Sequence, residues 1–347
     1  MTWGGYPVES CQFASRNDEP SILSVSWNGG SPAYWRKQER TKPAKMIERL
    51  QYAVAWTFLK TLEALPRPLA RGLAAAATRL LLFCLPRLRK TAELNLRLAF
   101  PEWTEPQRQA VMKQMSRSLG WMAVEFARLP QYTKKNIENV VVLDGHENFL
   151  AGQSRGKGVL YLTGHIGAWE LSSYAHALYG FPLHYMARPL DNKPLDALVN
   201  RYRGLSGNKP IYKNEAARMM LRVLKGAGTV GILADQNTMP DEGVFVDFFG
   251  VPACTTTGIA RVALHTDAAV VPGYLFWDEN IRKYRLRFEP PVELVRTGDT
   301  ERDVFENTQQ FANVLEGIIR RYPGQWVWIH ARWKNRPRGE APIYDFL

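Results

Sequence analysis

The feature that most constrains the fold is an alternation of short apolar, β-rich runs with segments of helical length, which begins near residue 140. The predicted strands are Val140–Leu143, Val159–Thr163, Leu183–Ala187, Thr229–Ala234, Ala269–Phe276 and Tyr284–Phe288. The predicted helices are Ile166–Tyr179, Pro194–Leu205, Glu215–Lys225, Thr256–His265 and Asp303–Tyr322. Alternation of this kind favours parallel strands that are covered on both faces. We therefore predict an α/β fold with a mainly parallel or mixed central sheet flanked by helices.

One predicted strand runs into the sequence YLTGHIGAWELS, residues 161–172. Gly164 permits a sharp exit from the strand, so His165 is expected at its carboxyl end. Glu170 is expected about one turn inside the following helix. Open α/β sheets usually keep their sites at this edge, so both side chains are candidate site residues.

His165 and Glu170 form a plausible catalytic pair. A neutral imidazole can take a proton from a hydroxyl, and a carboxylate on its other nitrogen would fix the tautomer and stabilise the imidazolium. With six histidines and 33 acidic residues, however, this spacing is expected about 0.6 times by chance. In the alternative interpretation His165 caps the helix and Glu170 is a first-turn acid favoured by the helix dipole.

Polar residues also follow two other predicted strands. Asp235 and Gln236 end the strand that begins at Thr229, and they would line the same crevice as His165 or cap a turn. Arg188 follows a shorter strand, with Asn192 close behind it. Arginine at this position would hold a phosphate or pair with a surface acid. We take these four residues as candidate substrate-binding residues.

The amino-terminal part divides into two segments before the α/β part. Residues 1–45 are rich in Gly, Pro, Ser and charge and are expected to be disordered or poorly packed, with Met46 as a hypothetical true start. Residues 46–90 contain two apolar stretches with arginine-rich flanks, but both are interrupted by charges. We predict a membrane-associated helical segment here, the alternative being a buried helical pair. Residues 91–347 form the remaining domain.

Charge and cysteine content narrow the class of ligand. The net charge of +12 indicates an anionic partner, such as a lipid surface, a phosphorylated substrate or nucleic acid. The three cysteines are far apart and the histidines are scattered, so we expect no disulfide framework and no metal site. The sequence contains neither a dinucleotide-binding fingerprint nor a Walker loop.

Two aromatic segments complete the set of motifs. Residues 244–251 are apolar and aromatic, and they would wall an acyl-chain groove or pack in the core. The segment QWVWIHARWKNRPRGE, residues 325–340, alternates tryptophans with bases. Trp326 and Trp328 are two residues apart, a spacing that fits a buried strand or a membrane-facing edge. Tryptophans among bases would also suit nucleic-acid stacking, but the hydrophobic amino-terminal region favours an anionic lipid as the partner.

Five ordered blocks together resemble the bacterial lipid A biosynthesis late acyltransferases, which are related to the glycerol-phosphate acyltransferases. The blocks are NLRLAFPE, GKGVLYLTGHIGAWE, ADQ, FVDFFGVPACTTTG and PGQWVWIHARWKNRPRGE, and they cover about Met46 to Glu340. One departure is Ala168, where the family more often has asparagine. His165 and Glu170 match the family's motif.

The resemblance implies an inner-membrane enzyme whose catalytic domain faces the cytoplasm. It implies transfer of a fatty acyl group from acyl carrier protein, or less often coenzyme A, to a glycolipid hydroxyl, without other cofactors. By this resemblance His165 is the general base and Glu170 its orienting partner, and Arg188, Asp235 and Gln236 are substrate-site residues. Alternative acceptors are a lysophospholipid, an aminolipid or a mannosylated lipid. The alternative of another class is a non-catalytic basic protein that binds membrane or nucleic acid.

Overall fold

The central sheet has seven strands in the order β1-β9-β8-β2-β5-β3-β4. The computed structural model describes residues 42–212 and 215–346. Strands β8, β2, β5, β3 and β4 are mutually parallel, whereas β9 is antiparallel to β8 and parallel to β1. The sheet is therefore mixed, as predicted. Its strands are β1 (Val141–Asp144), β2 (Val159–Thr163), β3 (His184–Ala187), β4 (Lys209–Tyr212), β5 (Thr229–Leu233), β8 (Ala269–Asp278) and β9 (Lys283–Phe288).

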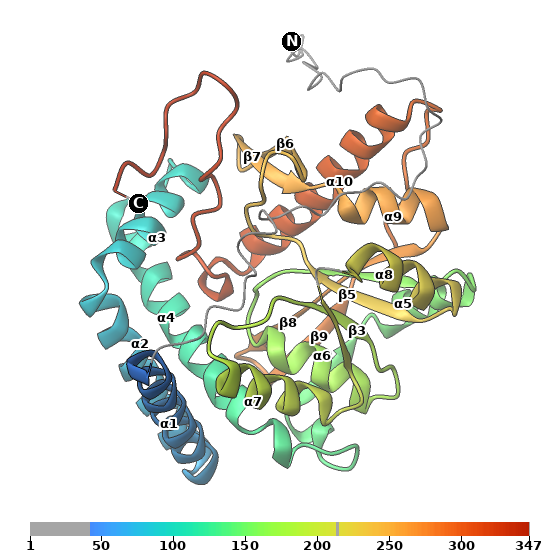
Figure 1. Cartoon of the computed structure of the whole chain (residues 1–347). Coiled ribbons are helices and arrows are strands. Elements are labelled where there is room, and N and C mark those ends of the chain that lie inside the picture. Colours follow the sequence, from blue (N-terminus) through green and yellow to red (C-terminus); the bar gives the residue numbers. More distant parts are fainter. Residues whose placement is uncertain (1–41, 213–214, 347) are drawn as a thin grey trace.

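Strand β2 lies at the centre of the sheet and is buried on both faces. Leu160 and Leu162 join one hydrophobic cluster, and Val159 and Tyr161 join the cluster on the opposite face. This explains why the strand reads as a continuous apolar run rather than as an alternating one. Helices cover the two faces, as Figure 1 shows. They are α5 (His146–Ser154), α6 (Trp169–Leu178), α7 (Lys193–Gly204), α8 (Ala216–Lys225), α9 (Gly258–Thr266) and α10 (Thr300–Arg321).

Most predicted strands and helices of the α/β part are present, with shifted ends, but the apolar run at 244–251 is not a single wall. It forms the antiparallel hairpin of β6 (Gly243–Phe248) and β7 (Val251–Thr256). Its two turn residues, Phe249 and Gly250, both have positive φ, of 58° and 77°. A two-residue turn of this hand matches the twist of the paired strands. Helix α5 and edge strand β4 were not predicted.

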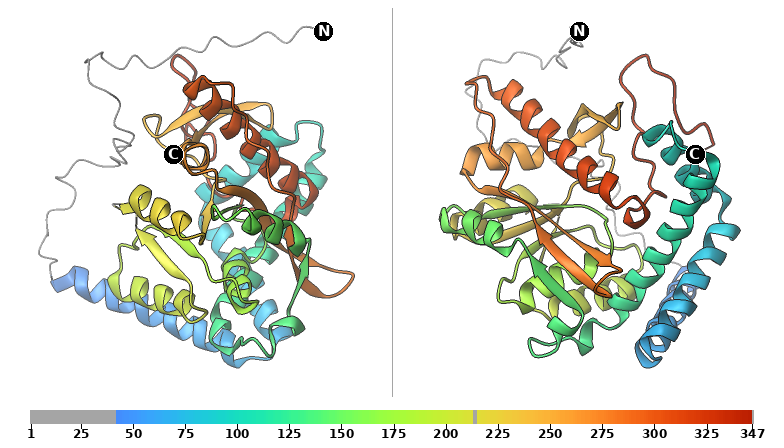
Figure 2. Two further views of the ribbon diagram at one scale, coloured as in Figure 1. Left: turned by 90° about the vertical axis from the view of Figure 1, so that its right-hand side faces the viewer. Right: turned by 180° about the vertical axis from the view of Figure 1, so that it is seen from behind.

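Within the described residues, four α-helices precede the first strand of the sheet. They are α1 (Lys42–Ala64), α2 (Arg67–Cys84), α3 (Pro86–Ala99) and α4 (Glu105–Ala127). Helices α1 and α2 lie side by side against α4, to one side of the sheet (Figure 2). Helix α1 begins at Lys42, before the predicted boundary at Met46, and the remainder of the predicted 1–45 segment lies outside the described residues.

Close packing fixes α2 on α4. A Cβ atom at Gly120 would lie 2.7 Å from the backbone of Ala74, so this helix crossing requires glycine. Arg71 of α2 donates a 2.8 Å hydrogen bond to the fully buried Glu125 of α4 and stacks on Trp121 and Trp277. Burying one charge without the other would be costly, so the pair ties α2 to the rest of the fold.

The outer surface of α1 and α2 is unusually apolar. Among the described residues no single helix combines the length and hydropathy that a membrane span needs. The bent pair α2 and α3, with 94° between the axes, passes that test only when the two are combined. Large apolar side chains are nevertheless exposed along the two helices, namely Met46, Ile47, Leu50, Val54, Trp56, Leu69, Leu73, Leu80, Leu81 and Phe83. Membrane association of this segment stays a prediction.

Candidate active site

The candidate site lies at the carboxyl edge of the sheet, where β2 and β5 end side by side. The two strands are parallel neighbours, with Thr163 opposite Leu233. His165 lies two residues beyond Thr163, and Asp235 lies two residues beyond Leu233. The shared register therefore brings these two side chains to the same place. The residues that follow these two strands lie together at one edge of the sheet.

His165 and Asp235 are joined by two hydrogen bonds. The His165 ring contacts Asp235 through Nδ1, 2.8 Å from Oδ1, and the His165 backbone N–H donates to Oδ2 at 2.7 Å. The indole of Trp326 donates a further 2.7 Å hydrogen bond to Oδ2. Three donors thus hold a carboxylate whose side chain is fully buried. Asp235 thereby sets the orientation of the imidazole.

The electrostatics match this geometry. Burial by itself disfavours protonated His165, but the charge and hydrogen bond of Asp235 outweigh burial and raise the pKa of His165 above its ordinary value. Burial likewise disfavours the carboxylate, yet His165 and the other donors lower the pKa of Asp235 to about 2. Asp235 is therefore ionised at neutral pH and stabilises an imidazolium at His165.

Glu170 does not occupy the predicted position against the imidazole. Helix α6 starts at Trp169, and the Glu170 carboxylate accepts a 2.8 Å hydrogen bond from Arg203 Nε and a second one from Arg203 Nη2. Asp235, and not Glu170, bonds to Nδ1 of His165. The prediction that Glu170 orients the ring is therefore wrong. The Glu170–Arg203 pair still acts on His165 electrostatically, since Glu170 raises and Arg203 lowers the pKa of the imidazole.

The His165 side chain is partly exposed, and its second nitrogen, Nε2, is not bonded to Asp235. The side chain is 19% exposed, Trp169 packs edge-on against the ring, and Gln236 Nε2 lies 3.4 Å from both ring nitrogens. Because Asp235 occupies Nδ1, Nε2 is the nitrogen that can meet a substrate hydroxyl. Gln236 thus lies beside both ring nitrogens of His165, and its substrate role stays a prediction.

The remaining two predicted substrate residues follow β3, the parallel neighbour of β5. Arg188 is exposed just beyond β3. Asn192 is buried, caps α7 by accepting from Leu195 N at 3.1 Å, and donates to Glu48 O at 2.9 Å and Gln51 Oε1 at 3.0 Å on α1. The contacts of Asn192 are therefore structural ones that tie α7 to α1.

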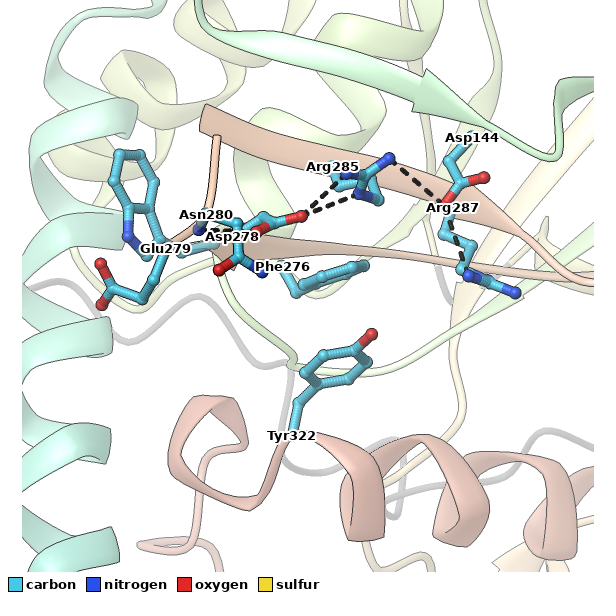
Figure 3. Close-up of a pocket in the computed structure, with 9 residues that line it drawn as sticks. Asp144, Phe276, Asp278, Glu279, Asn280, Arg285, Arg287 and Tyr322 are labelled. Atoms are coloured by element: carbon cyan, nitrogen blue, oxygen red, sulfur yellow. Dashed lines mark hydrogen bonds and ion pairs between the residues drawn. The ribbon is translucent and has the colours of Figure 1, made fainter. Parts of the chain in front are cut away.

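A separate cavity lies on the face of β8 and β9 that α10 covers, and it contains none of the predicted site residues (Figure 3). Its volume is about 480 Å³, and its arginines Arg285 and Arg287 are paired with Asp278 and Asp144. These charges satisfy one another. The chemistry is therefore assigned to the His165 edge.

Helix α6 points its amino terminus at this edge. Its N-cap residue is Ala168, which is fully buried and has no side-chain acceptor for the first N–H groups. An asparagine here, as in the usual family motif, has the side chain that most often caps a helix. In this chain residue 168 therefore supplies no side-chain cap.

Comparison with known proteins identifies the family to which the chain belongs. A family model described as "Bacterial lipid A biosynthesis acyltransferase" matches residues 40–335. The chain belongs to this family. Family membership confirms the resemblance and identifies the chain as an acyltransferase, which replaces the alternative of a non-catalytic basic protein.

Relatives of this acyltransferase include two whose names give different acyl groups. The lipid A biosynthesis lauroyltransferase of Escherichia coli is 28% identical over 304 residues, 87% of this chain and 96% of the relative. The palmitoleoyltransferase of Escherichia coli is 26% identical over 75% of this chain and 83% of the relative. A lipid A biosynthesis acyltransferase of Haemophilus influenzae is 25% identical over 74% and 79%.

Contacts of three residues that surround His165 or Glu170 in this acyltransferase were not predicted from the sequence. Asp235 was taken as a substrate residue although it bonds to Nδ1 of His165, and Arg203 and Trp326 were not identified as site residues. The position of Asp235 directly after a strand was a usable signal, because neighbouring parallel strands place such residues together. Arg203 and Trp326 carry no comparable local signal.

Proposed function

We propose that this acyltransferase moves a fatty acyl group from a thioester on acyl carrier protein, or on coenzyme A, to a hydroxyl of a lipid A precursor or related glycolipid. The observation that carries the proposal is the His165–Asp235 pair, in which Asp235 occupies Nδ1 and the His165 side chain is 19% exposed. This arrangement suits a general base that acts directly on a substrate hydroxyl.

The reaction then proceeds in two steps. His165 Nε2 takes the proton of the acceptor hydroxyl while its oxygen attacks the thioester carbonyl, and Asp235 stabilises the imidazolium that forms. The tetrahedral oxyanion collapses, the carbon–sulfur bond breaks, and the leaving thiolate takes the proton from His165. No covalent acyl-enzyme forms. N–H groups in the first turn of α6 stabilise the oxyanion.

Glu170 acts within this scheme through Arg203. Its carboxylate neutralises a guanidinium that would otherwise disfavour the imidazolium, and it fastens α6 to the end of α7. Arg203 also lies over the ring of Tyr185, with 5.5 Å from its central carbon to the ring centroid. Glu170 is thus a residue that the reaction needs although Asp235 holds the ring.

The exposed apolar surface of α1 and α2 is proposed to seat the enzyme on the inner membrane. Ten large apolar side chains of these two helices are exposed, which is typical of a surface that binds lipid. Basic side chains of α2 and α3, such as Arg79, Arg87 and Arg89, would contact lipid phosphates. The net charge of +12 suits an acidic carrier protein and an anionic lipid.

Product analysis tests this function. The purified full chain in vesicles is given labelled acyl carrier protein thioesters and a set of acceptors, and the acylated product is identified by mass spectrometry. We expect acylation of a lipid A precursor that is lost in His165→Ala. Acylation only of a lysophospholipid, an aminolipid or a mannosylated lipid would keep the enzyme class but reject the proposed acceptor.

A further inference from the structure

Residues 326–332, near the carboxyl terminus, bind the chain segment that follows β5. This segment contains Asp235, the carboxylate that orients His165. Three consecutive residues after β5 are each bonded to one residue of the carboxyl-terminal segment 326–332. The contacts are Trp326 Nε1 to Asp235 Oδ2 at 2.7 Å, Arg332 Nη1 to Gln236 O at 3.4 Å, and Asn237 N to His330 Nε2 at 3.0 Å. Three residues of this segment, Trp326, His330 and Arg332, thus contact the residues that follow β5.

Trp326 makes the most direct of these contacts. Its indole shares Asp235 Oδ2 with the backbone N–H of His165, which leaves Oδ1 for the imidazole. Trp326 and Asp235 are each 1% exposed, so water cannot replace the indole donor. Two fixed donors on Oδ2 prevent the carboxylate from turning away from the ring.

We propose that Trp326 is a positioning residue for the general base, which acts on His165 through Asp235. The inference rests on the proposed function, in which His165 must be neutral to accept a proton. Trp326 bonds to Asp235 and not to Nε2 of His165, the nitrogen that meets the substrate hydroxyl, and it limits how strongly Asp235 attracts the imidazole proton. Without the indole donor, the carboxylate charge would concentrate on the bond to Nδ1 and hold the imidazolium more tightly.

The charged and titratable groups around the pair are few. Asp235, Glu170 and Arg203 act on His165 as described, and His330 and Arg332 approach from the carboxyl-terminal segment. Burial lowers the pKa of His330 to about 4, and its Nε2 accepts an N–H, so the neutral ring carries its proton on Nδ1. Arg332 is 1% exposed, and its hydrogen bonds go to uncharged oxygens of Cys254 and Thr255. Burial lowers the pKa of Arg332, and the negative charge of Asp235 raises it and so opposes the effect of burial.

The chain supplies a matched control for Trp326. Trp328 lies two residues later, is 0% exposed, and its indole also donates one 2.7 Å hydrogen bond, to Pro323 O. Trp326→Phe and Trp328→Phe therefore each remove one buried indole donor from the same segment. Only the first removes a donor from Asp235.

The test measures the pKa of His165 by NMR in the full chain with ¹³C-labelled histidine, and His165→Gln assigns the signal among the six histidines. We expect Trp326→Phe to raise the pKa of His165, to move the acidic limb of the kcat/KM profile to higher pH, and to lower turnover at neutral pH about tenfold. Trp328→Phe should lower the melting temperature and leave that pKa unchanged.

Should Trp326→Phe fail to fold, 3-benzothienylalanine at position 326 keeps the ring size and replaces only the N–H by sulfur. An unchanged or lowered pKa of His165 in the Trp326 variant, or equal changes in both variants, overturns the proposal. Failure of the proposed function is distinguishable, because it appears as absence of acyl transfer by the unaltered chain. The NMR titration does not depend on that activity.

Discussion

His165 is oriented by Asp235, 70 positions away in the chain, through a 2.8 Å contact between Nδ1 and Oδ1. The carboxylate that is nearer in the sequence, Glu170, is instead paired with Arg203. The roles of base, orienting acid and charge-compensated pair can be separated by mutation.

Removal of the base should abolish transfer. His165→Ala is expected to lower turnover by about 10²–10⁴-fold, the contribution of a positioned general base, while the protein stays folded. Initial rates of acyl transfer and a thermal unfolding curve measure this. His265→Gln serves as the control, because His265 lies near the opposite end of the sheet, just before β8. Near-normal turnover of His165→Ala would reject the mechanism.

Removal of the orienting carboxylate should change both rate and pH dependence. Asp235→Asn is expected to lower kcat about 10³–10⁴-fold, since the ring loses its tautomer and its counter-charge. Asp235 raises the pKa of His165, so its loss lowers that pKa, and the acidic limb of the kcat/KM profile moves to lower pH. Asp278→Asn, which removes a carboxylate paired with Arg285, should leave the profile unchanged. A limb that stayed in place would show that Asp235 does not act on His165.

Glu170 and Arg203 should behave as one unit. Glu170→Ala is expected to lower turnover by orders of magnitude, because the freed Arg203 charge disfavours the imidazolium and α7 loses its attachment to α6. A double-mutant cycle with Glu170→Gln and Arg203→Gln measures their coupling. The double variant should be no less active than Glu170→Gln alone. Additive losses would instead give Glu170 a role of its own in the chemistry.

Asn192 should affect stability more than substrate affinity. Asn192→Ala removes the α7 cap and two contacts to α1, and loss of the cap alone typically costs about 1 kcal/mol of unfolding free energy. Denaturant unfolding measures that cost, and the KM for the acceptor lipid is determined in parallel. Stability that stayed the same with a raised KM would instead support the prediction of direct substrate binding.

The apolar surface of α1 and α2 should control membrane binding. Leu80 and Phe83 are 62% and 73% exposed, and Leu80→Asp with Phe83→Asp is expected to shift the protein from vesicle pellet to supernatant. Sedimentation with phosphatidylethanolamine and phosphatidylglycerol vesicles measures this. Leu150→Asp is the control, since Leu150 is 42% exposed on α5 and lies outside this surface. Equal binding by all variants would exclude the surface as the lipid contact.

Much of the fold followed from local patterns in the sequence. The run Val159–Thr163 was predicted with its observed ends, because a central strand is apolar throughout and glycines mark both of its boundaries. The β6–β7 hairpin was missed because its turn, Phe249–Gly250, interrupts the apolar pattern only at one glycine. Strand β4 was missed because an edge strand with exposed residues has little hydrophobic signal.

The sequence by itself determined that His165 follows a strand and precedes a helix, and that the chain resembles an acyltransferase family. Only the tertiary structure decided which groups surround His165. Local periodicity specifies the type of each element, but it does not specify that β5 rather than β3 pairs with β2. That strand order, with its register, puts Asp235 on Nδ1, and the packing of α7 turns Glu170 toward Arg203. Trp326 joins the site for the same reason, because long-range packing brings the carboxyl-terminal segment to the end of β5.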